Sequence, residues 1–432
     1  MDKSTTRIEP DQPLLTNDND MDNERLSPQQ KKQMRDREDL NFWNVMKQIC
    51  DLSVYPIVGM LFHPAYQIVN TIILGQDDEA VNNLAIFGLA TVTMSIAMMS
   101  IQLSFNNALM TLVSQAHGQQ EPRLCSIYLN RQLVLNVIVF IPLCILLLFA
   151  ESFFLAIGQQ AEIAQRASNY IRVLLPGYFC FGIFHAYQKY LAGQKEVRLS
   201  TFSYVLAFII HLPVSYLLAV YYDMGVEGIA IASSIHLSMR LIILSIAIKF
   251  SQFNSNLVSI IDQETFRNLK PQMKMSLYSS GMLIWGWWAF DIFTFLSNFM
   301  TNDIMAAQIV CRQIVLLFYM IPIGLSIASS ILVGNMIVIN LINEAFVMLC
   351  LYILFDCLQC IGTGIISGLG KQNKGSLLTI FYFKMGITAL WQGPLVAIAF
   401  NSVAYYAFIL CVDLKETIRI AEERRLREKN HL

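Results

Sequence analysis

Residues 277–300 read LYSSGMLIWGWWAFDIFTFLSNFM, a run of 24 residues that holds a single charged side chain, Asp291. A helix that crosses a bilayer needs about 20 consecutive, mostly apolar residues. The run is therefore long and apolar enough to span a membrane. A charge at the centre of a bilayer costs roughly 2.5–3.5 kcal/mol on insertion scales, so an acid in this position indicates a partner or a function.

The rest of the chain has the same apolar character. Of its 432 residues, 55% are hydrophobic and 14% are charged, whereas soluble domains carry about 25% charged residues. The apolar runs are continuous and do not alternate, which excludes a transmembrane β-barrel. The predicted fold class is all-α: a polytopic membrane protein with a helical bundle of two pseudo-symmetric lobes.

The totals also exclude some functions. A net charge of −1 gives no bulk attraction to nucleic acid. The chain contains no GxSxG, HExxH or phosphate-loop motif, so we expect neither an enzyme nor a cofactor.

The apolar segments predict the domain organisation. Residues 1–42 are polar and are expected to form a disordered cytosolic tail. A first lobe of six transmembrane helices is expected at 43–250, followed by a cytosolic linker at 251–274. A shorter second lobe of about four helices is expected at 275–412, and a second cytosolic tail at 413–432. The segments themselves lie at 43–73, 80–113, 127–150, 164–190, 199–221, 226–250, 275–300, 304–335, 343–367 and 385–411.

The loops between these segments alternate in charge. One set is basic and the other is acidic, and by the positive-inside rule the basic set faces the cytoplasm. Both termini are then cytoplasmic, and the membrane itself is either the plasma membrane or a vacuolar or endosomal membrane. The basic set is Arg123, Arg131, Lys189, Lys195, Arg198, Arg267, Lys270 and Lys274, and the acidic set is Asp77, Asp78, Glu79, Glu151, Glu162, Asp223 and Glu227.

The chain shows a weak internal repeat. LSFNNALMTLVSQ (103–115) is similar to GLSIASSILVGN (324–335), and LAGQKEVRLSTFSY (191–204) is similar to LGKQNKGSLLTIFY (369–382). Matched positions lie 79 residues apart in the first half, from Leu112 to Leu191, but 37 apart in the second, from Leu332 to Leu369. The difference equals about one membrane helix with its loop. A further shortfall beyond position 382 suggests that the second half is about two helices shorter.

Three stretches, taken in order, resemble the signatures of a known family: ALMTLVSQAHG (108–118), YMIPIGLSIASSILVGN (319–335) and FDCLQCIGTGIISGLGKQ (355–372). The chain resembles the multidrug and toxic compound extrusion (MATE) family over roughly residues 44–416. This resemblance implies two six-helix lobes around a central cleft, with about 10 helices here against 12 in the family. It also implies a secondary active antiporter that exports organic cations or xenobiotics in exchange for protons or sodium. Its partners would be the organic cation, the coupling ion and membrane lipid.

Two acids are candidates for binding proton and cation. In eukaryotic members of the family the seventh helix reads Glu-Trp-Trp-x-aromatic-Glu, and this chain has Gly286 at the first acidic position and Asp291 at the second. Asp356 matches an acidic position of the family's tenth helix. A carboxyl group in a low-dielectric interior favours its neutral form, which lets it bind and release protons near neutral pH. Alternatively, each acid pairs with a neighbouring donor and only supports packing.

One cation complicates this interpretation. Arg312 lies inside the helix at 304–335, where some animal members carry glutamate, and it is expected to pair with Asp291 or Asp356. Such a pair would hold the acid ionised and withhold it from the cargo. Trp287, Trp288 and Tyr319 are expected to line the cleft through cation–π contacts, or alternatively to pack between helices.

Other polar groups within the apolar segments are less informative. For Arg240 we expect snorkelling or pairing within the bundle, and for each of His63, His185, His211 and His236 a satisfied position in the core. Two alternatives to export stay open. The chain could be a non-transporting or incomplete copy of such a transporter, or a flippase for lipid-linked substrates, which would need a basic cavity.

Overall fold

The structure is a computed structural model that describes residues 42–76, 79–253, 257–258, 262–296 and 302–337. The chain divides into two units, residues 1–48 and residues 49–432. The described part of the first unit is the beginning of one helix. The bundle and the sites discussed below lie within the second unit. The expected cytosolic tails, the second part of the shorter lobe and Asp356 fall outside the described residues.

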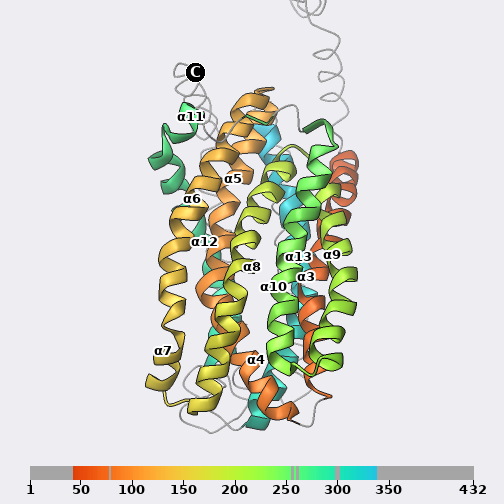
Figure 1. Ribbon diagram of the computed structural model, residues 1–432. Coiled ribbons are helices and arrows are strands. Elements are labelled where there is room, and N and C mark those ends of the chain that lie inside the picture. The colour runs from red at the N-terminus through yellow and green to blue at the C-terminus, as the bar shows by residue number, and fades with distance from the viewer. Residues whose placement is uncertain (1–41, 77–78, 254–256, 259–261, 297–301, 338–432) are drawn as a thin grey trace, which may run out of the picture. The chain divides into compact units, whose positions relative to one another are not determined.

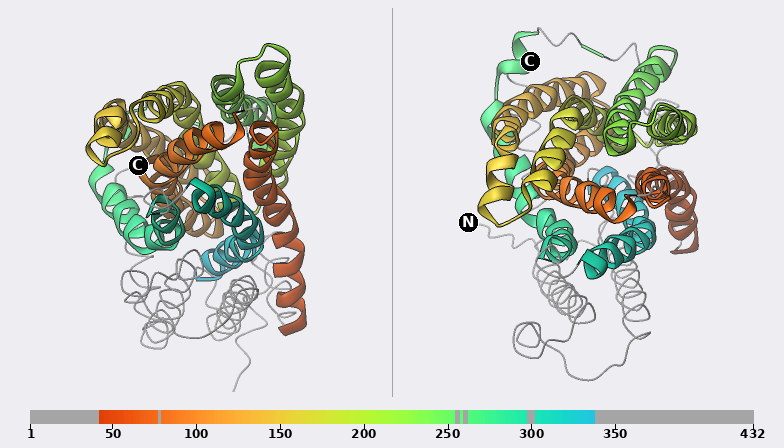
Figure 2. Two further views of the ribbon diagram at one scale, coloured as in Figure 1. Left: turned by 90° about the horizontal axis from the view of Figure 1, so that it is seen from below. Right: turned by 60° about the horizontal axis from the view of Figure 1, so that its bottom comes forward.

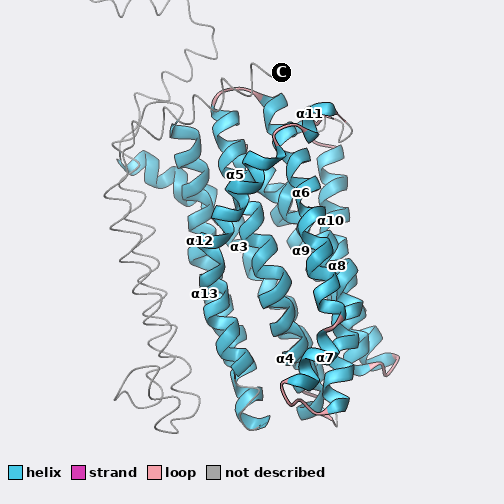
Figure 3. Ribbon diagram, turned by 90° about the vertical axis from the view of Figure 1, so that its left-hand side faces the viewer, coloured by secondary structure: helices cyan, strands magenta, loops and turns pink. Residues whose placement is uncertain are grey.

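Every described element longer than a turn is a helix, and the described residues contain no strand (Figures 1 and 3). The predicted all-α class is therefore confirmed. The elements are α3 (Phe42–Leu74), α4 (Ala80–Met94), η1 (Ser95–Met99), α5 (Ser100–Gly118), α6 (Pro122–Leu148), α7 (Ala150–Ala156), α8 (Ala161–Gly193), α9 (Arg198–Tyr216), η2 (Leu217–Tyr221), α10 (Gly225–Lys249), α11 (Gln263–Phe266), α12 (Leu269–Leu296) and α13 (Asn302–Ile337).

Six helical stretches of the described part are long and apolar enough to cross a membrane. A helix satisfies all its interior backbone hydrogen bonds internally, which the hydrocarbon core of a bilayer requires. The outward surface is correspondingly apolar, with Leu146 64%, Phe149 66% and Phe250 83% exposed. The inward face of α6 instead carries Asn130, Gln132 and other buried polar groups. The chain is thus an integral, multi-pass membrane protein.

Helix α8 lies at the centre of the first-lobe helices. It packs against α4, α5, α6 and α10, and α10 packs in turn against α9 (Figure 2). Close approach of α8 and α10 depends on Gly177, whose missing side chain would lie 2.9 Å from the Ser234 Cα. The apolar core of this part joins residues of α4, α8 and α10, among them Phe87, Phe181 and Ile229.

Helices α12 and α13 pack against the first-lobe helices along α5 and α4. Met320 and Ile327 of α13 share an apolar cluster with Met60 of α3 and Met110 of α5. These contacts place α12 and α13 beside the continuous α4–η1–α5 stretch, Ala80–Gly118. The polar site described next lies at this junction.

Candidate functional site

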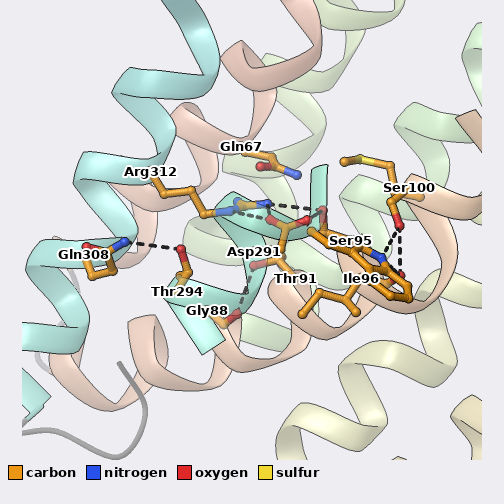
Figure 4. Close-up of polar contacts among 12 residues, drawn as sticks. Gln67, Gly88, Thr91, Ser95, Ile96, Ser100, Asp291, Thr294, Gln308 and Arg312 are labelled. Carbon is orange, nitrogen blue, oxygen red and sulfur yellow. Dashed lines mark hydrogen bonds and ion pairs between the residues drawn. The ribbon is translucent and has the colours of Figure 1, made fainter. Parts of the chain in front are cut away.

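The aspartate of the opening stretch lies at the junction of three elements. Asp291 on α12 is 1% exposed and faces Arg312 on α13, which is 3% exposed (Figure 4). The Arg312 Nε and Nη2 groups both donate to Asp291 Oδ1, the former at 2.9 Å. The Ser95 hydroxyl of η1 donates to the other carboxylate oxygen, Oδ2, and accepts a bond of 3.3 Å from Arg312 Nη2. Both carboxylate oxygens therefore have a donor.

This pairing decides the charge state of the site. A buried charge is tolerated when it is paired and its remaining hydrogen-bonding capacity is filled. Asp291 meets both conditions through Arg312 and Ser95, so the described arrangement is a salt bridge between an ionised acid and a guanidinium. The bridge ties α12 and α13 to each other and to η1.

A second polar contact follows about one turn away. Gln308 of α13 donates to the Thr294 hydroxyl of α12 at 3.4 Å (Figure 4). Both side chains are buried. The α12–α13 contact thus includes an ionic pair and this neutral hydrogen bond, and both depend on the register between the two helices.

The five residues Ser95–Met99 form a π-helix between α4 and α5. π-helical turns break the regular i→i−4 bonding and occur frequently at functional sites. Trp288 of α12 donates its indole N–H to the Ile96 carbonyl and to the Ser100 hydroxyl, each at 3.0 Å. Trp288 is therefore bound to this turn and is not among the residues that line the cavity, unlike the expectation from sequence.

A cavity of about 140 Å³ lies beside the ion pair, between α3, α5 and α8 of the first lobe and α12 and α13. Trp287 and Tyr319 line it, and their rings meet edge to face with centroids 5.7 Å apart. Asp291 lies one helical turn beyond Trp287 and does not line the cavity. The polar side chains in the wall are His63, Ser104, Asn107, His185, Lys189, Tyr204, Tyr319, Ser326 and Ser330, together with the indole of Trp287.

The first lobe holds a polar cluster that sequence reasoning treated as separate residues. Arg240 is completely buried and contacts the imidazoles of His63 and His236. His211 bonds to Asn70 at 2.9 Å, and its ring lies 4.9 Å from that of His236. The four histidines lie on four different helices, but the fold brings His63, His211 and His236 together around Arg240. His236 and Arg240 are four residues apart on one helix, and this spacing was the one sign in the sequence that they contact each other.

For His185 the prediction of a core position with its hydrogen bonds satisfied was wrong. This side chain is 2% exposed, yet neither ring nitrogen has a hydrogen-bond partner among the described residues. It lines the cavity. The sequence did not show which residues of this helix face the cavity: Lys189 was expected in a basic loop, but it lies within α8 and is 7% exposed.

The described geometry defines a class of protein: a polytopic helical membrane protein with buried charges and a partly polar cavity between its helices. Comparison with known proteins makes the class specific. The MatE family model matches residues 56–217. Protein DETOXIFICATION 16 of Arabidopsis thaliana is 22% identical over 378 residues, covering 73% of this chain and 78% of that protein.

Two further comparisons agree. Multidrug and toxin extrusion protein 1 of Homo sapiens is 21% identical over 395 residues, 77% of this chain and 69% of that protein. The crystal structure of the eukaryotic MATE transporter AtDTX14 superposes with a TM-score of 0.78 at 19% identity, covering 89% of this chain and 99% of that one. The chain is thus similar in sequence to the MATE family of membrane transporters over residues 56–217, and it shares the fold of a eukaryotic member.

Proposed function

We propose that the chain is a secondary active antiporter that exports small organic solutes, organic cations in the first place, in exchange for protons. One observation carries the proposal: a carboxylate inside the helical bundle, Asp291, is buried where α12 and α13 meet η1. Intramembrane acids are rare and typically mark ion or substrate pathways.

The proton step involves the described ion pair. When a proton binds Asp291, the carboxyl becomes neutral and its attraction for Arg312 falls to that of an ordinary hydrogen bond. The contact among η1, α12 and α13 then weakens, and this change couples proton binding to movement of the lobes. A sodium ion would need several oxygen ligands, but both oxygens of Asp291 already accept hydrogen bonds from Arg312 and Ser95. The geometry therefore favours protons as the coupling ion.

The cargo class rests on the names of the relatives and on the cavity. Two relatives are called multidrug and toxin extrusion proteins, and the aromatic faces of Trp287 and Tyr319 can contact a flat organic ion. Asp291, once released by Arg312, would attract a cation, and Asp356 stays a second proposed acid. Proton and cation would then compete for the same negative charge, as exchange requires.

Transport in proteoliposomes tests this proposal. The full chain is reconstituted, a pH gradient is imposed, and uptake of radiolabelled tetraethylammonium is followed. We expect Asp291→Asn to abolish the uptake driven by the gradient, because an amide cannot exchange a proton. Asp223→Asn is the matched control: Asp223 is exposed at a turn with φ of 53°, a conformation that asparagine tolerates.

Each other outcome is informative. Gradient-driven uptake that survives in Asp291→Asn would contradict the role of this acid. Absence of any solute transport by correctly inserted wild-type protein would favour a non-transporting copy. Movement of a lipid-linked phosphate between leaflets, with no effect of the pH gradient, would instead favour the flippase alternative.

A further inference from the structure

One wall of the cavity carries two adjacent basic side chains of α8. His185 and Lys189 are four residues apart, so they share one face of the helix, and both line the cavity. Lys189 is 7% exposed, and its ammonium group bonds to the Asn107 amide oxygen at 2.9 Å. An ammonium has three donors, and among the described residues the Asn107 amide oxygen is the acceptor of one of them. His185 has unpaired nitrogens, as described above.

A second buried cation stands directly behind this wall. Arg240 donates to His63 Nδ1 at 3.2 Å and to His236 Nε2 at 2.8 Å, and its guanidinium lies 4.6 Å from the Tyr204 ring centroid. A guanidinium only donates, so both imidazole nitrogens act as acceptors and both rings are neutral. His63 and Tyr204 also line the cavity.

No acidic side chain balances these charges within the described residues. Lys189 and Arg240 form no ion pair there, and the lining of the cavity contains no carboxylate. A buried cation without a counter-charge is costly, and partners normally compensate it. A ligand with a negative group could therefore supply the counter-charge that the described residues do not provide.

The opposite wall has a different chemistry. Trp287, Met320 and Ile327 present aromatic and apolar surface. The volume of about 140 Å³ is close to that of an apolar cavity of roughly 150 Å³ that accepts benzene. The space thus suits a small ligand with an anionic head and a hydrocarbon or aromatic body.

We propose that this cavity binds an organic carboxylate, with its negative group at Lys189 and His185 and its apolar part against Trp287. The proposal rests on the proposed transport function and extends its cargo to solutes that carry a carboxylate. Arg240 contributes as a positioning residue: it holds His63 in place and adds positive potential from behind the wall.

Calorimetric binding to the purified full chain in detergent tests the proposal with two probes of similar shape and opposite charge, benzoate and benzylammonium. We expect benzoate to bind at least about tenfold more tightly. Lys189→Met is expected to weaken benzoate binding by at least about tenfold and to leave benzylammonium binding equal or stronger. Lys249→Met, at an exposed lysine near the end of α10, is the matched control and should bind as wild type does.

Loss of binding must reflect the site and not the fold. Lys189→Arg keeps the charge and should retain most of the benzoate affinity, and His185→Gln should weaken it with the thermal stability of the protein unchanged. Preferential binding of benzylammonium, equal benzoate binding by wild type and Lys189→Met, or no benzoate binding in the millimolar range would each overturn the proposal.

The two proposals can fail separately. Benzoate binding is measured in detergent without a pH gradient, and Asp291 does not line the cavity, so this measurement does not depend on the proton step. Proton-driven tetraethylammonium uptake without benzoate binding would remove this inference and keep the antiporter. If the wild type binds benzoate, and if Asp291→Asn still takes up tetraethylammonium in response to the pH gradient, the inference stands and the proposed role of Asp291 fails.

Discussion

At the scale of single residues, the pair Asp291–Arg312 should contribute to stability as well as to coupling. Arg312→Gln leaves a buried carboxylate without its cation and is expected to lower the free energy of unfolding by about 3–5 kcal/mol. Unfolding by sodium dodecyl sulfate in mixed micelles measures this change. Arg172→Gln is the control, because Arg172 pairs with Glu151 at 3.3 Å with 43% of its side chain exposed, and exposed pairs contribute about 0–1 kcal/mol.

A double-mutant cycle separates the pair from its surroundings. Asp291→Asn with Arg312→Gln removes both charges, so the double variant should lose clearly less stability than the sum of the two single variants. Additive losses would show that the contact contributes little beyond the packing of each side chain.

The same residues show how far the sequence can predict a site. Asp291 was visible because it is a lone acid in an apolar run. The cost of unpaired buried charges predicted that Arg312 pairs with Asp291 or Asp356, and only the structure shows that the partner is Asp291. Which neighbouring tryptophan faces the cavity was not visible. Trp287 and Trp288 differ by 100° around α12, and both lipid and core are apolar, so hydropathy does not distinguish the two faces.

At the scale of elements, close approach of α8 and α10 should depend on one glycine. A Cβ atom on Gly177 would lie 2.9 Å from the Ser234 Cα and 3.0 Å from its carbonyl oxygen. Backbone atoms cannot move aside independently, so Gly177→Ala is expected to lower the free energy of unfolding by about 1–3 kcal/mol. The same micelle unfolding measurement applies.

Gly281 of α12 provides the matched control. A Cβ atom there would have no neighbour within 4 Å, so Gly281→Ala should be neutral or raise stability by up to about 1 kcal/mol through helix propensity. Equal effects of the two substitutions would contradict the packing assigned to α8 and α10.

The helices themselves were largely predictable, and their irregularities were not. The segment at 226–250 corresponds to α10, Gly225–Lys249, because polar loop residues flank its apolar run. The segment at 80–113 ends early, since α5 continues to Gly118 through polar residues. The π-helix Ser95–Met99 gave no compositional signal: its extra residue is stabilised by tertiary contacts such as that of Trp288 with the Ile96 carbonyl.

At the scale of the described bundle, the charged side chains outside the apolar layer pair at its two ends. At one end Arg123 forms ion pairs with Asp262 and Glu264. At the other, Arg166 pairs with Glu227 at 3.0 Å. By the positive-inside rule we expect the end that holds Arg123 and Asp262 to face the cytoplasm.

Accessibility of single cysteines tests this orientation. In a variant without the nine native cysteines, Gln263→Cys reports on the linker end and Gln160→Cys on the opposite end, and both glutamines are exposed. An impermeant maleimide is added to sealed vesicles whose cytoplasmic face points outward. We expect it to label Gln263→Cys and to leave Gln160→Cys unlabelled until detergent opens the vesicles. The reverse pattern would place residues 251–274 on the outer side of the membrane and would contradict the orientation assigned by the positive-inside rule.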